Sequence, residues 1–148
     1  MVDQALQSLA KFLPEITLAI TFCLTLLVGL IVRSRPQLSL WIAFLGVVAS
    51  VVFTLREMGT AESVFSGMIA VDPFATFFKL LVGLCAIFIF LFSLYSAEVL
   101  STIKRLVEYS SLLVAMTLGM YLMAGATNLL MMVLSIELTG LSSYVLAG

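Results

Sequence analysis

Histidine is absent from this 148-residue chain, and charged residues are scarce. Without histidine, the chain cannot form Ser-His catalytic pairs, histidine-based zinc sites or histidine-ligated haem. Asp, Glu, Lys and Arg make up 10% of the residues, whereas soluble domains carry about 25%. The net charge of −1 also argues against nucleic acid as the main partner. These shortages exclude an ordinary soluble domain.

Sulfur-containing residues point to packing rather than to chemistry. The two cysteines, Cys23 and Cys85, fall within long apolar runs, and we expect small core side chains rather than a disulfide or redox pair. Five methionines between positions 116 and 132 raise the alternative of a copper site. No cysteine or histidine accompanies them, which favours adaptable packing.

Apolar residues dominate the composition of the chain. They account for 63% of the chain, and the mean hydropathy is +1.25. A membrane-crossing helix needs about 20 apolar residues, and only helices or closed barrels satisfy the backbone in lipid. The sequence therefore predicts an all-α integral membrane protein, a single membrane domain with five transmembrane helices. Their expected ranges are about 13–32, 38–55, 74–96, 106–125 and 127–148.

Local signals mark two of the helix starts. Pro14 stands in the first turn of the first expected helix, where its missing N–H does little harm. Asp72 is expected to cap the third helix, with Pro73 just inside it.

The basic residues indicate the orientation in the membrane. Under the positive-inside rule, connections rich in Lys and Arg face the cytoplasm. We therefore expect a multi-pass protein of an energy-transducing membrane, most simply a bacterial inner membrane, with the N-terminus outside and residue 148 on the cytoplasmic side. The two cytoplasmic connections carry Arg33, Arg35, Lys104 and Arg105, whereas the opposite side carries Lys11 and Arg56 among five acidic residues.

Glu137 is the residue that most suggests a function. It lies near the middle of the last expected helix, among apolar, small and hydroxylic residues. An unpaired charge at the bilayer centre costs about 2.5–3.5 kcal/mol even on lenient insertion scales, so such residues are usually functional. We predict that Glu137 is a buried glutamate in a proton pathway and that it transfers protons, and we keep a purely structural hydrogen bond as the alternative.

Two faces of this last helix differ in character. Ser135, Thr139, Ser143 and Ala147 recur every four residues, which predicts a stripe for close helix packing. Glu137 lies on another face, so one side should pack tightly while the other faces a polar pathway. Gly140, one turn on, leaves room there for water or a neighbouring helix.

Lys79 and Tyr144 are weaker candidates for the same chemistry. Lys79 stands about 8 Å into the third expected helix. We expect its ammonium to snorkel to the outer interface, with a part in proton transfer as the alternative. Tyr144 either helps a proton path from Glu137 or anchors the helix end at the interface.

The segment 128–148 closely resembles the fifth helix of the N subunit of proton-pumping NADH:quinone oxidoreductase, respiratory complex I. The shared features are the opening asparagine, the central Glu137-Leu138 pair, the small residues that follow and the Tyr-x-Leu near the end. Leu13-Pro-Glu-Ile16 and Val71-Asp-Pro-Phe-Ala75 support the same resemblance. It extends over the whole chain and corresponds to the N-terminal part of that subunit.

This resemblance implies a subunit of the membrane arm, similar to cation/proton antiporters, in an enzyme that reduces quinone with NADH. It implies that Glu137 interacts with a lysine on a later helix and takes part in proton translocation. It also implies that NADH, FMN, iron–sulfur clusters and quinone bind other subunits, with no cofactor in this chain. The expected partners are the other membrane subunits, including antiporter-like neighbours, and the lipid bilayer.

The chain stops at Gly148, before the later helices of that family. We therefore expect a fragment, a split-gene product or a truncation that does not pump alone. Two other functions stay open from the sequence. One is a subunit of a related cation/proton antiporter or membrane-bound hydrogenase, and the other is a structural membrane subunit without a transport role.

Overall fold

The computed structural model describes residues 12–32, 37–56, 62–64, 69–96 and 106–148. Five of its helices are long and apolar enough to cross a membrane, which confirms the predicted all-α membrane architecture. The helices begin and end within two residues of the expected ranges. They are α2 (Leu13–Ile31), α3 (Gln37–Arg56), α4 (Pro73–Tyr95), α6 (Leu106–Gly125) and α7 (Leu129–Ala147).

Local chemistry at three helix starts explains where these helices begin. Asp72 caps α4, since its Oδ1 accepts a hydrogen bond from the Ala75 N–H at 2.6 Å, as predicted. Asn128 caps α7 in the same way, with Leu130 as the donor at 3.3 Å. Pro14 occupies the first turn of α2, where no backbone donor is needed.

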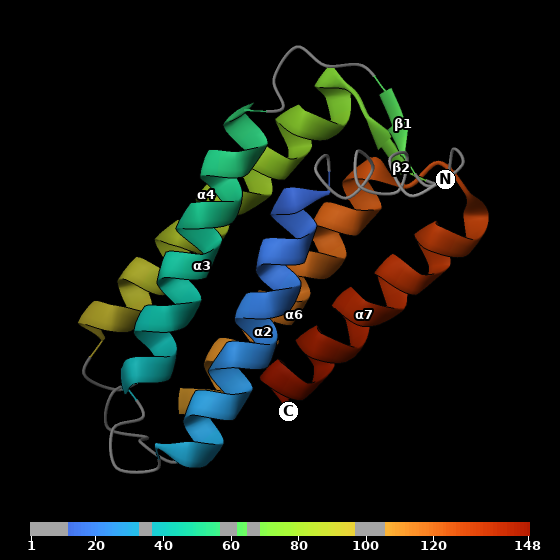
Figure 1. Cartoon of the computed structure of the whole chain (residues 1–148). Coiled ribbons are helices and arrows are strands. Elements are labelled where there is room, and N and C mark those ends of the chain that lie inside the picture. The colour runs from blue at the N-terminus through green and yellow to red at the C-terminus, as the bar shows by residue number, and fades with distance from the viewer. Residues whose placement is uncertain (1–11, 33–36, 57–61, 65–68, 97–105) are drawn as a thin grey trace.

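Four helices form a bundle, and the fifth lies on its outside (Figure 1). Helices α3 and α6 contact each other, and both α2 and α4 pack against this central pair. Helix α7 packs along α6. The starts of α2, α4 and α7 share one end of the bundle with the ends of α3 and α6 (Figure 1).

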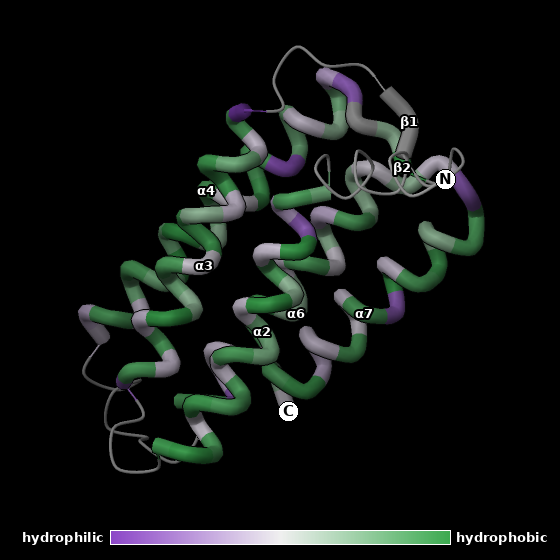
Figure 2. Tube along the Cα trace, viewed as in Figure 1, coloured by the Kyte–Doolittle hydropathy of each residue, from purple (hydrophilic) through white to green (hydrophobic). Residues whose placement is uncertain are grey.

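The core lies between α2, α3, α4 and α6. Its fully buried members include Leu18, Leu40, Val47, Phe90 and Val114. The helices are hydrophobic along most of their length (Figure 2), and many large apolar side chains, such as Leu30 and Phe92, are exposed on the outside of the bundle. An apolar exterior is what a lipid environment requires.

A short hairpin stands at the end of the bundle where α4 begins (Figure 1). Strands β1 (Glu62–Val64) and β2 (Ile69–Val71) pair antiparallel, with Ser63 opposite Ala70. Strand β2 also forms a bridge from Ile69 to Ala126, just after α6. The sequence did not predict this hairpin, which covers part of the bundle end.

The prediction that both cysteines lie in the core is wrong. Cys23 and Cys85 are free but exposed on the outer surface, not in the core as expected. The reason is that lipid accepts small apolar side chains as readily as the protein interior does. The connections 33–36 and 97–105, used to predict the orientation, lie outside the described residues.

Candidate functional site

Glu137 lies halfway along α7. It is the ninth of 19 residues, about 12 Å from the helix start. Figure 2 shows a hydrophilic stretch midway along this otherwise mostly pale and green helix. Both ends of α7 are therefore many ångströms from the Glu137 carboxylate, so this carboxylate lies at the depth of the membrane interior.

One side of α7 packs against α6 through the Ser135 and Thr139 part of the predicted stripe, whereas Ala147 at the end of the stripe is exposed. Ser135 is fully buried. A Cβ placed on Gly119 of α6 would come within 2.4 Å of the Thr139 Oγ1 and 3.2 Å of the Ser135 carbonyl oxygen. Only a glycine allows the two backbones to approach so closely. The hydroxyls of Ser135 and Thr139 donate to carbonyls of their own helix, so they act in packing.

The described helices of this chain do not provide the predicted burial of Glu137. Within the described residues its side chain is exposed. So are the residues that share its face, Leu130, Val133, Leu134, Leu141 and Tyr144. The physical reason is that α7 has α6 along one side, and no other described helix covers the opposite side. Tyr144 itself is 75% exposed.

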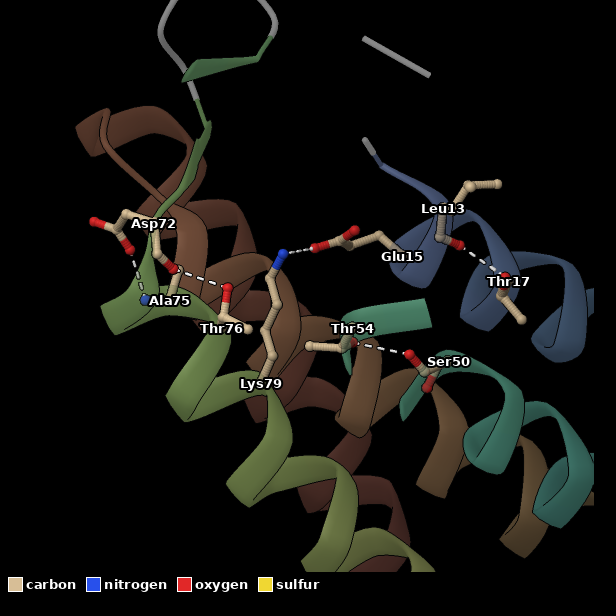
Figure 3. Close-up of polar contacts among 9 residues, drawn as sticks. All are labelled: Leu13, Glu15, Thr17, Ser50, Thr54, Asp72, Ala75, Thr76 and Lys79. Atoms are coloured by element: carbon tan, nitrogen blue, oxygen red, sulfur yellow. Dashed lines mark hydrogen bonds and ion pairs between the residues drawn. The ribbon is translucent and has the colours of Figure 1, made fainter. Parts of the chain in front are cut away.

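Lys79 does not snorkel to the interface, and that expectation is wrong. Its side chain is 1% exposed, and its Nζ lies 2.5 Å from the Oε1 of Glu15, which is also 1% exposed (Figure 3). Lys79 is the seventh residue of α4, and Glu15 is the third residue of α2. The Lys79 ammonium therefore points into the bundle, because it forms an ion pair there with the Glu15 carboxylate.

Glu15 is the ionisable residue that sequence reasoning missed. In the sequence it stands out only as part of the Leu13–Ile16 motif and as one of the five acidic residues of the outer side. A signal was present, however. Glu15 and Lys79 have opposite charges, and both stand within two turns of a helix start on the same side of the membrane. Two such residues in neighbouring helices can meet at one depth, and membrane charges commonly pair.

The structure keeps the two charged sites apart. Lys79 and Glu15 meet inside the bundle, whereas Glu137 is on the outer helix α7 and is exposed. Among the described residues, no three Cys, Asp or Glu side chains gather in a way that could hold a metal ion. The arrangement provides ionisable groups at membrane depth, which suit the movement of protons better than bond-forming chemistry.

Known proteins that are similar to this chain are named as subunits of NADH- or NAD(P)H-quinone oxidoreductases. No family model matches the chain. The NADH-quinone oxidoreductase subunit N 2 of Chloroherpeton thalassium is 42% identical over 94% of this chain. Subunit N of an Anaeromyxobacter species is 35% identical over the full chain. The chloroplastic NAD(P)H-quinone oxidoreductase subunit 2 of Chlorokybus atmophyticus is 34% identical over 95% of it.

These matches confirm the resemblance that the motifs indicated. Over nearly all of its residues, the chain is similar to part of subunit N of NADH-quinone oxidoreductases. The chain spans 28–29% of the length of these three relatives. That share is consistent with the predicted match to the N-terminal part.

Proposed function

We propose that this chain is part of the membrane arm of a proton-translocating NADH:quinone oxidoreductase. In that assembly Glu137 contributes a carboxylate to a proton pathway, and electron transfer takes place on other subunits. The proposal also places the chain in an energy-transducing membrane, with the hairpin end of the bundle outside. Its support comes from the related subunits N and from the position of Glu137.

The single observation that carries the proposal is an exposed carboxylate at the middle of α7. Contact of a charge with lipid at this depth costs about 2.5–3.5 kcal/mol or more. The exposed face around Glu137 must therefore be covered by protein or by water. A further helix of the subunit satisfies this requirement, and a lysine on it would pair with Glu137.

A carboxylate with such a partner can act as a switch. While the ammonium is close, the carboxylate is stabilised as an anion, and when the ammonium withdraws, the carboxylate takes up a proton. Electron transfer elsewhere in the complex would drive this exchange by shifting a two-state element that holds the partner. Glu137 thereby contributes to translocation without any redox centre of its own.

Copurification tests membership of the complex. The protein, carrying an affinity tag and expressed in its own cells, should copurify with subunits that oxidise NADH. Sealed vesicles from the same cells should take up protons when NADH is added. Association with a hydrogenase or with antiporter subunits instead, and no NADH-driven proton uptake, would contradict the proposal.

A further inference from the structure

The Glu15–Lys79 pair joins two helices that are held apart by others. Helices α2 and α4 both pack against α3 and α6, and the ion pair crosses the bundle between them (Figure 3). Both side chains are 1% exposed. The two charges therefore meet inside the protein rather than at its surface.

The carboxylate of Glu15 is poorly satisfied. Its Oε1 contacts the Lys79 ammonium, but its Oε2 is fully buried and has no hydrogen-bond donor among the described residues. A carboxylate can accept about four hydrogen bonds, and a buried ion pair offsets its desolvation only when further hydrogen bonds support it. Oε2 is thus a buried acceptor site for a proton or a water molecule.

The polar groups around the pair do not fill this site. Thr54 of α3 and Thr76 of α4 lie in the same region (Figure 3). The Thr54 hydroxyl donates to a carbonyl of α3, and the Thr76 hydroxyl donates to the carbonyl of the cap residue Asp72. Asp72 accepts from the start of α4. Arg56, near the end of α3, is exposed and lies over the ring of Phe53. Glu15 and Lys79 thus form a local pair of acid and base.

The hairpin helps to separate this pair from the water outside. A Cβ on Gly125 would lie 4.0 Å from the Lys79 Cε, and it would also meet Ile69 Cγ2 at 3.0 Å and the Ala70 carbonyl at 3.1 Å. Lys79 and β2 therefore pack around the same glycine. Ile69 is 3% exposed. One layer of chain thus stands between the pair and the end of the bundle.

We infer that Glu15 and Lys79 form a second proton-exchange site, separate from Glu137, at the hairpin end of the bundle. Within the pair, one proton moves from Nζ to Oε1 and leaves a neutral amine and a neutral carboxyl. In uptake from outside, hydronium gives its proton to Oε2 and leaves as water, so that the pair gains one positive charge. The Lys79 ammonium remains protonated in this second step.

The competing explanation is that the pair only holds α2 and α4 together. Variants that remove one or both charges distinguish this structural role from proton exchange. Glu15→Gln or Lys79→Met alone leaves one unpaired buried charge, so each should reduce the amount of assembled complex. The double variant removes both charges and should recover assembly. If the pair exchanges protons, the assembled double variant shows a several-fold loss of NADH-driven proton translocation. Translocation at the parental ratio would overturn the inference.

A matched control comes from the opposite end of the bundle. The Ser93 and Tyr109 hydroxyls lie 2.7 Å apart and join α4 to α6. The double variant Ser93→Ala with Tyr109→Phe removes a partly buried polar contact between helices but no group that exchanges protons near neutral pH. It should translocate protons at the parental ratio. An equal loss in this control would show that any missing buried contact has the same effect, which contradicts a special role of the pair.

A spectroscopic test remains decisive if the double variant fails to assemble. Infrared difference spectra between two pH values near neutrality report the carbonyl stretch of carboxyl groups that gain or lose a proton. In membranes containing the complete protein, Glu15→Asp keeps an acid at this position and should shift one such band. If no carboxyl band moves in Glu15→Asp, Glu15 does not exchange protons and the inference is wrong.

The translocation test rests on the proposed function, whereas the infrared test does not require NADH or partner subunits. A band that shifts in Glu15→Asp, in a protein without NADH-driven proton uptake, would sustain this site and reject the proposed function. NADH-driven proton uptake without a shifted band in Glu15→Asp would support the proposed function and reject the Glu15–Lys79 site.

Discussion

Alanine substitutions at two glycines test the contact between α6 and α7. Gly119 of α6 is crowded by α7, whereas Gly140 of α7 has more space around it. An alanine at Gly119 would place its Cβ 2.4 Å from the Thr139 side chain and 3.0 Å from the Thr139 backbone nitrogen. The hydroxyl can rotate away, but the backbone cannot. Helix α7 must then shift by a few tenths of an ångström. An alanine at Gly140 would meet its nearest atom, Tyr144 Cε2, at 3.7 Å, an ordinary contact.

The expected magnitudes follow from these distances. Overpacking costs about 1–3 kcal/mol, and replacing a helical glycine by alanine returns about 0.5–1 kcal/mol. Gly119→Ala should therefore lower the free energy of unfolding by up to about 2.5 kcal/mol, with a middle value of about 1 kcal/mol. Gly140→Ala should leave it unchanged or raise it by up to about 1 kcal/mol. Unfolding of the purified protein in mixed micelles, followed by circular dichroism, measures both. Equal effects of the two substitutions would refute the close approach of α6 and α7 at Gly119.

Two further predictions concern orientation and a helix start. In a background where both native cysteines are replaced by alanine, an impermeant thiol reagent applied to intact cells should label Ser63→Cys and not Ser34→Cys. Labelling of Ser34→Cys alone would invert the proposed orientation. Asp72→Ala removes the acceptor for the Ala75 N–H and should lower the free energy of unfolding by about 1 kcal/mol. Asp72→Asn, which keeps an acceptor oxygen, should lower it less, and an equal loss would show that the cap does not stabilise α4.

The sequence was sufficient to predict the five helices, because each of them must cover the membrane with its own apolar residues. The cap at Asp72 was equally predictable, since capping depends on residues next to each other in the chain. The packing stripe through Ser135 and Thr139 was visible for the same reason, as its period follows from one helix. These features are local or follow from the membrane.

Features that depend on which helices are neighbours could not be predicted in this way. Lys79 was expected to snorkel because its helix was considered alone, whereas its direction is set by Glu15 on another helix. Cys23 and Cys85 were expected in the core because hydrophobicity does not distinguish the interior of a membrane protein from its lipid-facing surface. The strands of the hairpin have three residues each, too few for an alternating pattern to show.

The role of Glu137 is a separate question from its position. The sequence placed it at the middle of a membrane helix, and the structure agrees. What the structure adds is that its face of α7 is exposed among the described residues. The proton pathway through Glu137 therefore stays a prediction that depends on the helix or water that covers this face.

The most direct test of that pathway is proton translocation by Glu137→Gln in the complete complex. The amide keeps the size and polarity of the side chain but cannot ionise. Proton uptake into sealed vesicles driven by NADH should fall several-fold, while NADH oxidation with an artificial acceptor stays at the parental rate and shows intact assembly. Glu137→Asp should be milder, and Ser142→Ala, which removes a hydroxyl bonded within its own helix, should translocate normally. Parental ratios of protons to electrons in Glu137→Gln would show that Glu137 is structural and that the account is wrong.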